Sequence, residues 1–136
     1  MSMAILHRKE YIDQVLATEP VVGKHSLEPL KSLAESLGGS VKILEDVRVA
    51  DNEAEVHDKE KDVWLCLEGQ PTFVYGGELV DKMQVKDGEW KGKSIRDGTM
   101  VVLKPGDWLE ISAGEPHQHN CPDGVARLVI IKVPVK

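Results

Sequence analysis

Cysteine, long apolar runs and positive charge are all scarce in this 136-residue sequence. Its two cysteines, Cys66 and Cys121, are too few for a disulfide-stapled secreted scaffold and lack the paired spacing of a zinc knuckle. No stretch approaches the roughly 18 apolar residues that a membrane-spanning helix requires. The opening letters MSMAILHRKEYIDQ turn polar before the apolar core of a signal peptide could form. We therefore expect a cytoplasmic protein with reduced thiols and no membrane partner.

Basic residues are outnumbered by acidic ones. The sequence has 17 Lys and Arg against 23 Asp and Glu, which gives a formal net charge of -6. Because a phosphate backbone would be repelled on average, we expect no nucleic-acid partner. Three catalytic patterns are also missing: a G-x-S-x-G elbow, a glycine-rich phosphate loop before a helix, and G-x-G-x-x-G after a strand. The length fits a single domain.

Residues 1–39 are expected to form an N-terminal helical segment that packs on the rest of the domain. An imperfect helical pattern over residues 5–16 ends at Glu19-Pro20 and predicts a short amphipathic helix. Ser26 is a candidate N-cap for a second helix, which Gly38-Gly39 would terminate. The second helix carries an apolar stripe that we expect to pack in the core: Leu27, Leu30, Leu33, Ala34 and Leu37.

Residues 40–136 change from a helical period to a period of two. They contain β-rich segments, SVKIL, DVRVA, VWLCL, TFVY, TMVVL, WLEIS and ARLVIIKV, separated by turns such as KPGD and CPDG. Many short strands with frequent turns predict a sandwich or small barrel. The polar, glycine-rich stretch 76–100 is expected to be a long hairpin or loop that could lie over a site.

The first chemical cluster lies in EVHDKEKD at residues 55–62. Residues two apart on a strand share a face, so Glu55 and His57 would project to the same side. Glu60 or Asp62 could join them from the start of the next strand. Asp62 could instead be an ordinary solvated charge, since charge runs are usually exposed.

The second cluster follows the turn SAGEP, where His117 and His119 are again two apart. If the two hairpins face each other, imidazoles and carboxylates converge on one point. A divalent cation is the group that keeps such a cluster from repelling itself. His119 is either a further ligand, a group behind the ligands, or a histidine without a role at the metal.

The first cluster resembles the first motif of the cupin family, usually written G-x5-H-x-H-x3-4-E-x6-G. His57, Asp62 and Gly69 have the spacing of the second histidine, the acid and the closing glycine. Glu55 stands in the place of the first histidine and Val49 in the place of the opening glycine. The spacing is kept although several letters change.

The second cluster resembles the second cupin motif, usually written G-x5-P-x-G-x2-H-x3-N. Gly106, Gly114 and His117 match, whereas Ser112 replaces proline and Cys121 replaces asparagine. The longer stretch DVWLCLEGQPTFVYGGELVD, with the two motifs, also resembles a group of small single-domain bacterial cupins of poorly defined function.

The resemblance implies an all-β, cupin-type double-stranded β-helix, or jelly-roll barrel, over residues 40–136, with one or two short helices before it. It implies a homodimer. It also implies a divalent metal ion, Fe, Mn, Ni or Zn, held by Glu55, His57, Asp62 and His117, with Glu60 or His119 as substitutes if Asp62 is too short to reach.

The expected function is that of a metal-dependent enzyme acting on a small polar metabolite. The chemistry would be of the oxygenase type, or that of a lyase or isomerase working through an enolate, with Glu60 or Glu115 moving the proton. Two alternatives stay open: a non-catalytic module that binds a sugar or another small molecule, and a metal-free sugar isomerase or epimerase. Drift at the motif positions favours the first alternative.

Overall fold

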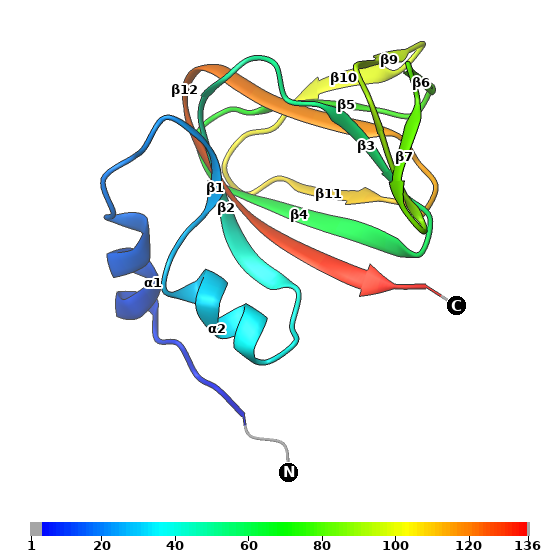
Figure 1. Cartoon of the computed structure of the whole chain (residues 1–136). Helices are drawn as coiled ribbons and strands as arrows, with labels where there is room; N and C mark the ends of the chain where they lie inside the picture. Colours follow the sequence, from blue (N-terminus) through cyan, green and yellow to red (C-terminus); the bar gives the residue numbers. More distant parts are fainter. Residues whose placement is uncertain (1–3, 136) are drawn as a thin grey trace.

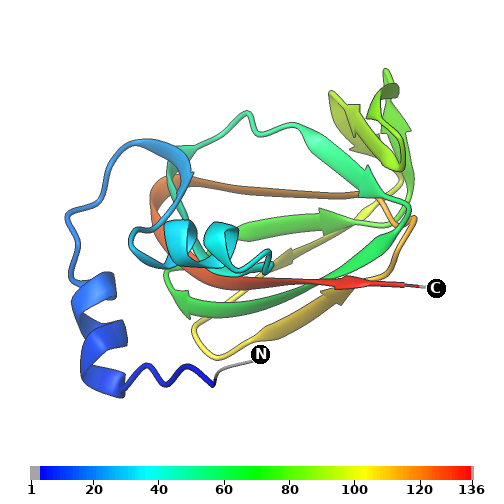
Figure 2. The same cartoon turned by 60° about the horizontal axis from the view of Figure 1, so that its bottom comes forward.

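Strand β12 (His117–Pro134) is the element on which the other strands are arranged. In the computed structural model, which describes residues 4–135, this 18-residue strand pairs with β2, β3, β4 and β5. Its first part belongs to one sheet and its last part to another, and the register shifts between Cys121 and Val125. Figure 2 shows the strand, orange then red, passing from one sheet to the other.

Ten of the strands form two antiparallel sheets that face each other. Sheet A contains the last part of β12 with β1 (Gly23–Ser26), β2 (Val41–Val49), β4 (Glu60–Glu68) and β11 (Trp108–Ile111). Sheet B contains the first part of β12 with β3 (Ala54–His57), β5 (Thr72–Tyr75), β7 (Met83–Lys86), β8 (Glu89–Gly92) and β10 (Thr99–Val102). The predicted jelly roll is confirmed. The ladder of hydrogen bonds does not close into a complete barrel, because β1, β7, β10 and β11 each pair on one side.

The core lies between the inner faces of the two sheets. Trp64, Phe73, Ile111 and Leu128 are almost completely buried there and pack with Cys66. Each large apolar side chain removed from water stabilises the fold by about 1.5–3 kcal/mol. Burial also raises the pKa of the Cys66 thiol to about 11, which suits a small core side chain rather than a nucleophile.

Gly69, the glycine that closes the first motif, has a backbone reason to be there. It has φ +79° at the end of β4, and a Cβ atom on it would lie 2.1 Å from the carbonyl oxygen of Val125. Only glycine fits this turn without a shift of the backbone.

The N-terminal part contains two short helices, α1 (Lys9–Leu16) and α2 (Leu30–Ser36). Figure 1 shows both on one side of the molecule, next to β2. Ser26 is not the N-cap that the sequence predicted. It lies in β1 and pairs with Leu44, because the proline at position 29 disfavours helical backbone in the residue before it and α2 begins only at Leu30. No helix within residues 4–135 has the length and apolar character needed to cross a membrane.

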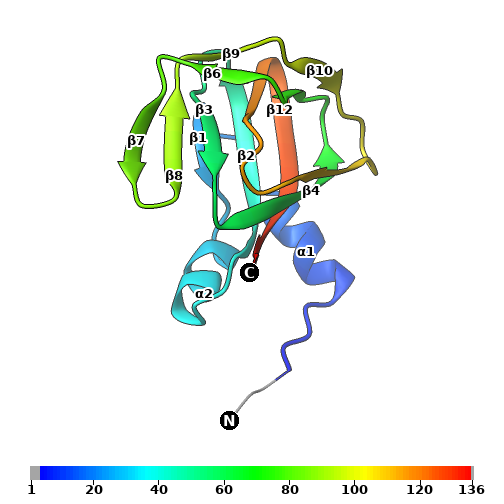
Figure 3. The same cartoon turned by 90° about the vertical axis from the view of Figure 1, so that its right-hand side faces the viewer.

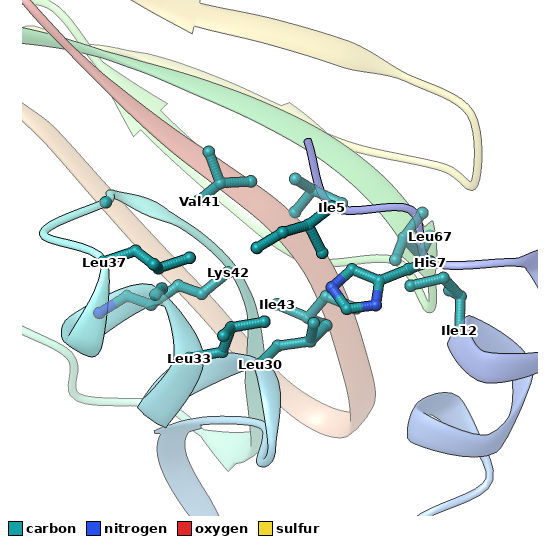
Figure 4. Close-up of a pocket in the computed structure, with 13 residues that line it drawn as sticks. Ile5, His7, Ile12, Leu30, Leu33, Leu37, Val41, Lys42, Ile43 and Leu67 are labelled. Carbon is teal, nitrogen blue, oxygen red and sulfur yellow. The ribbon is translucent and has the colours of Figure 1, made fainter. Parts of the chain in front are cut away.

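The leucine stripe at α2 was expected to be core, and part of it is, because Leu30 packs against the buried cluster that contains Leu27. Only Leu27 is buried, whereas Leu37 is 62% exposed. The stripe also lines an apolar cavity of about 480 Å³ between α2, the segment before α1, and the outer face of sheet A. Figure 4 shows Leu30, Leu33 and Ile43 around this space.

Stretch 76–100 folds as short strands rather than as an irregular loop. β6 (Glu78–Val80) pairs with β9 (Ser94–Arg96), and β7 pairs with β8. β8 also pairs with β3, so that Glu89 lies opposite His57. Figure 3 shows the β7–β8 hairpin at the open edge of sheet B, beside β3. The edge strands expose Met83, Met100 and Trp108, and the homodimer stays a prediction.

A buried ion pair attaches the N-terminal part to sheet A. The Nε atom of Arg127 donates a hydrogen bond to Oε1 of Glu45 at 2.8 Å, and both side chains are buried. The same guanidinium donates to the backbone carbonyls of Leu16 and Thr18, where α1 ends. His25 of β1 contacts the other oxygen of Glu45 at 2.7 Å. One pair of side chains therefore connects α1, β1, β2 and β12.

Replacing Arg127 by Met should lower the free energy of unfolding by about 3–5 kcal/mol, because it leaves the Glu45 carboxylate buried without its main partner. Urea denaturation followed by tryptophan fluorescence would measure this change. Lys61→Met, which removes the partially exposed pair with Glu110, is the matched control and should cost about 0–1 kcal/mol. A loss below 1 kcal/mol in Arg127→Met would contradict the assigned role.

Candidate metal site

A charged cavity of about 420 Å³ lies between the inner faces of the two sheets. Three strands of sheet A change there from an apolar to a charged residue on the same face: Leu44 to Lys42 on β2, Trp64 to Asp62 on β4, and Ile130 to Lys132 on β12. An inward charge is costly unless it is paired or reached by solvent or a ligand. The change marks the point where the apolar core ends and a polar site begins.

The carboxylate of Asp62 is at the centre of this site and is completely buried. Its Oδ1 atom accepts a hydrogen bond from Nζ of Lys132 at 2.9 Å. Its Oδ2 atom lies 3.3 Å from Nε2 of His117 and 3.5 Å from Nε2 of His57, yet it has no hydrogen-bond partner among the described residues. A buried carboxylate oxygen without a partner is the kind of atom that a bound cation satisfies.

Both imidazole rings present Nε2 to this oxygen because their Nδ1 atoms are already engaged. Nδ1 of His117 lies 3.2 Å from the backbone oxygen of Glu115, which can only accept a hydrogen bond, so that Nδ1 carries the proton. Nδ1 of His57 contacts the Glu89 carboxylate. Hydrogen bonding of one ring nitrogen to a carbonyl or carboxylate is how metal-ligating histidines are commonly oriented.

The strand registers explain why these groups meet. Glu55 on β3 lies directly opposite His117 on β12, and Oε2 of Glu55 is 3.4 Å from Nε2 of His57. Asp62 on β4 lies opposite Lys132 on β12. The chain leaves sheet B after His57 and enters sheet A at Glu60, so one sharp corner brings the two sheets' charged groups together. Glu55, His57 and His117 each offer a ligand atom within 4.8 Å of the others.

The charges of the cluster stabilise one another. Burial alone would raise the pKa of Glu55, but contact with His57 and the charges of Lys24 and both imidazoles lower it to about 2. Burial would likewise raise the pKa of Asp62, but His117, His57 and Lys132 hold it well below its usual range. The pKa of His57 is raised to about 10, because the contacts with Asp62, Glu55 and Glu89 outweigh burial and the charge of Lys132.

The ammonium of Lys132 places a positive charge within the cluster. Its ammonium is 2.9 Å from Asp62, 3.3 Å from Nε2 of His57 and 3.6 Å from Glu60. It therefore neutralises part of the carboxylate charge without any bound ion. A metal ion at Asp62 would compete with this ammonium for the carboxylate.

The sequence candidates are distributed unevenly over the structure. Glu55, His57, Asp62 and His117 lie together, and Glu60 lines the same cavity within reach of His57 and Glu89. The short side chain of Asp62 was expected to limit its reach to the other candidate ligands. It does not, because the corner between β3 and β4 brings its oxygen close to both imidazoles.

His119 and Glu115 do not join the cluster. His119 lines the cavity, but its Nδ1 atom lies 2.5 Å from the buried Asp46 and its ring packs against Trp64 and Phe73. The carboxylate of Glu115 accepts a hydrogen bond from the backbone N–H of Ser112 at 3.1 Å and closes the turn before β12. The role of Glu115 as a proton carrier stays a prediction, although its carboxylate is engaged in a turn.

Two residues of the site were missed in the sequence. Lys132 has a readable signal, since it continues the inward face of Ala126, Leu128 and Ile130, where a charge is out of place. Glu89 has no such signal in the sequence, because its position next to His57 depends on the pairing of β8 with β3.

The metal-free protein should lose stability at both ends of the pH range. The His57 pKa is raised from 6.5 to about 10, so its contribution is complete below pH 6.5 and is lost as the pH rises toward 10. The Glu55 pKa is lowered from 4.5 to about 2, so its contribution is complete above pH 4.5 and is lost as the pH falls toward 2. Urea midpoints of chelator-treated protein measured from pH 5 to 9.5 test the alkaline side.

His57→Gln should flatten this alkaline loss, whereas His7→Gln, which changes a histidine stacked on Tyr11 outside the cluster, should retain it. An unchanged slope in His57→Gln would contradict the assignment of the alkaline loss to His57.

Comparison with known proteins supports the fold but not a relationship in sequence. No family model matches the sequence, and no curated protein matches it either. Among solved structures, a predicted oxalate decarboxylase from Thermotoga maritima superimposes with a TM-score of 0.53 at 12% identity, over 82% of this chain and 79% of that one. A cupin protein from Bacteroides fragilis gives 0.52 at 15% identity, over 87% and 81%. FeII HppE gives 0.53 at 14% identity, over 80% of this chain and 49% of that chain. The chain therefore has the cupin fold that its two motifs predicted.

Proposed function

We propose that this cupin binds one divalent metal ion and acts as a metal-dependent enzyme on a small polar molecule. The observation that carries the proposal is the buried Oδ2 atom of Asp62, which has no hydrogen bond and faces the Nε2 atoms of His57 and His117. Two imidazoles with engaged Nδ1 atoms and an unpartnered carboxylate oxygen have the donor chemistry of a metal site.

Glu55, His57, Asp62 and His117 are the residues that would hold the ion. Two imidazoles and two carboxylates suit Fe(II), Mn(II), Ni(II) or Zn(II). A bound ion of this kind acts as a Lewis acid on a substrate oxygen. Glu89 orients the ring of His57, and the backbone carbonyl of Glu115 orients the ring of His117.

Glu60 is the side chain placed to move a proton. It lines the cavity and lies 3.6 Å from the Lys132 ammonium. It is free of the central Asp62 contacts, so it can accept a proton from a substrate and return it. A lyase or isomerase reaction needs such a proton carrier, whereas an oxygenase-type reaction depends more on the metal ion.

The structural neighbours support the proposal only at the level of the fold. FeII HppE and the predicted oxalate decarboxylase show that proteins named for iron or for decarboxylation share this architecture. A shared fold does not assign a reaction, so the argument depends on the residues of the cavity.

Lys132 favours a second candidate function. Because its ammonium already contacts Asp62 and approaches His57, part of the negative charge of the cluster is neutralised without a metal ion. A metal-free isomerase or epimerase, or a module that only binds a small molecule, would use the same cavity with Lys132 as its resident cation. Metal analysis separates these functions from the first one.

Metal loading should give one tightly bound ion per chain. Chelator-treated protein incubated with Fe(II), Mn(II), Ni(II) or Zn(II), desalted and measured by elemental analysis, provides the test. His57→Ala and His117→Ala should each weaken binding at least 100-fold, and Glu89→Gln should weaken it about 10–100-fold through the orientation of His57. His7→Ala is the control and should bind normally. Failure of the wild type to retain any of the four metals would exclude the metal site.

The enzyme proposal has its own test. Each metal-loaded form is incubated with a broad mixture of metabolites, and mass spectrometry follows the loss of any component. Glu60→Gln should reduce the turnover found while it keeps the metal, because it removes the proton carrier and leaves the ligands. Metal retention without turnover of any metabolite would favour the non-catalytic module.

Metal affinity should rise with pH by about tenfold per unit between pH 6 and 9. The reason is that the ion must displace the proton of His57, whose pKa is about 10 in the metal-free protein. Competition with a chromophoric chelator at several pH values measures the slope. A flat profile would show that His57 is not a ligand.

A further inference from the structure

Lysine side chains gather at the cavity although the protein as a whole is acidic. Five of them line it, Lys24, Lys42, Lys86, Lys91 and Lys132, against four carboxylates, Glu55, Glu60, Asp62 and Glu89. The cavity therefore has a surplus of positive charge in a chain whose formal net charge is -6. Such a local reversal of sign raises the concentration of anions at a site.

Two of these lysines come from the inner faces of sheet A. Lys42 lies opposite Ile130 in the ladder, and Lys132 lies opposite Asp62. Lys132 continues an apolar face of β12, and Lys42 follows Leu44 on the inner face of β2; a lysine in such a place is disfavoured unless its ammonium has a partner. Lys132 has Asp62, whereas Lys42 has no ion pair among the described residues. Lys42 lines this cavity and also the apolar cavity next to α2, and an ammonium at the cavity wall without an ion pair leaves a positive charge that an anionic ligand can neutralise.

Two further lysines, Lys91 on β8 of sheet B and Lys24 on β1 of sheet A, are only loosely paired. Nζ of Lys91 is 3.8 Å from Oε1 of Glu55, and Nζ of Lys24 is 4.0 Å from the same atom. These distances are too long for hydrogen bonds and leave the ammonium groups free to turn toward another anion. A cation could bind the carboxylates of Glu55 and Asp62. The ammonium groups of Lys24, Lys91 and Lys132 would then each lose part of the negative charge that now offsets theirs.

We propose that the cavity binds a small organic carboxylate, with Lys42, Lys91 and Lys132 holding its carboxylate group. This inference deepens the proposed function and rests on it for the part that the metal ion plays. The volume of about 420 Å³ suits a small metabolite. The carboxylate occupies the lysine side of the cavity, and the remaining oxygens of the ligand face His57 and His117.

A phosphate group fits these walls less well. Phosphates are commonly held by backbone N–H groups of a glycine-rich turn or a helix N-terminus, or by the paired donors of arginine. The described residues that line the cavity include no glycine and no arginine, and they lie in strands or strand turns rather than in a helix. Separate ammonium groups on three strands are sufficient for the smaller charge of a carboxylate.

Isothermal titration of the metal-loaded protein tests the proposal with defined probes. Succinate, malate and glucuronate are the carboxylates, glucose is the neutral partner of glucuronate, and inorganic phosphate is the competing anion. At least one carboxylate should bind at millimolar concentration or better, and glucuronate should bind at least tenfold more tightly than glucose. Lys42→Met and Lys132→Met, which keep the bulk of the stem, should each weaken the carboxylate at least tenfold.

Lys104→Met is the matched control, because Lys104 is exposed and does not line the cavity. It should bind the carboxylate as the wild type does. Equal binding of glucose and glucuronate, tighter binding of phosphate than of every carboxylate, or unchanged affinity in Lys42→Met would overturn the proposal. Circular dichroism of each variant verifies that a loss of binding is not a loss of folding.

Elemental analysis of the same samples separates this inference from the proposed function. Carboxylate binding by a protein that retains no metal would support the lysine site and contradict the metal site. Metal retention without binding of any carboxylate would overturn the lysine site alone. A Lys42→Met variant that keeps its metal but loses the carboxylate would support both.

Discussion

The buried carboxylate of Asp62 determines which groups must surround it. A buried carboxylate is tolerated only where cations or hydrogen bonds replace the water that it loses. The fold supplies them from two strands: His57 at the end of β3, and His117 and Lys132 near opposite ends of β12. These contacts still leave Oδ2 without a hydrogen bond. The side chains around Asp62 are thus fixed in orientation, while one carboxylate oxygen remains available to a ligand.

The two faces of sheet A use buried charge in different ways. On the outer face, Glu45 and Arg127 lie directly opposite each other and satisfy one another together with the ends of α1. That pair is complete and has a structural role. On the inner face, the pairing of Asp62 with Lys132 is incomplete and opens onto a cavity. Burial alone does not distinguish a structural ion pair from one at a reactive site. The difference is whether every polar atom of the pair has a hydrogen-bond partner.

The sequence predicted the jelly roll and the meeting of Glu55, His57, Asp62 and His117 because these features depend on local spacing. Alternation on a strand places residues two apart on one face, and the two motifs lie on neighbouring strands. The start of α2 was predicted wrongly because the proline at position 29 delays the helix, whereas the role of Glu115 stays a prediction, since its carboxylate is engaged in a turn. Glu89 could not be predicted, since its place at His57 follows from the register between β3 and β8. Lys132 could have been found from its inward position in an apolar strand.

The open ladder of sheet B has a consequence for the walls of the cavity. The β7–β8 hairpin carries Lys86, Glu89 and Lys91, and it pairs with the sheet along one side only, through β3 and the turn at Asp58 that follows it. The opposite wall, on β2, β4 and β12, is enclosed by neighbours on both sides. Segments at a free edge separate from a sheet at a lower free-energy cost than internal strands. The hairpin is therefore the wall of the cavity that would separate from the sheet at the lowest cost, and because it carries Glu89, its separation would also remove that carboxylate from His57.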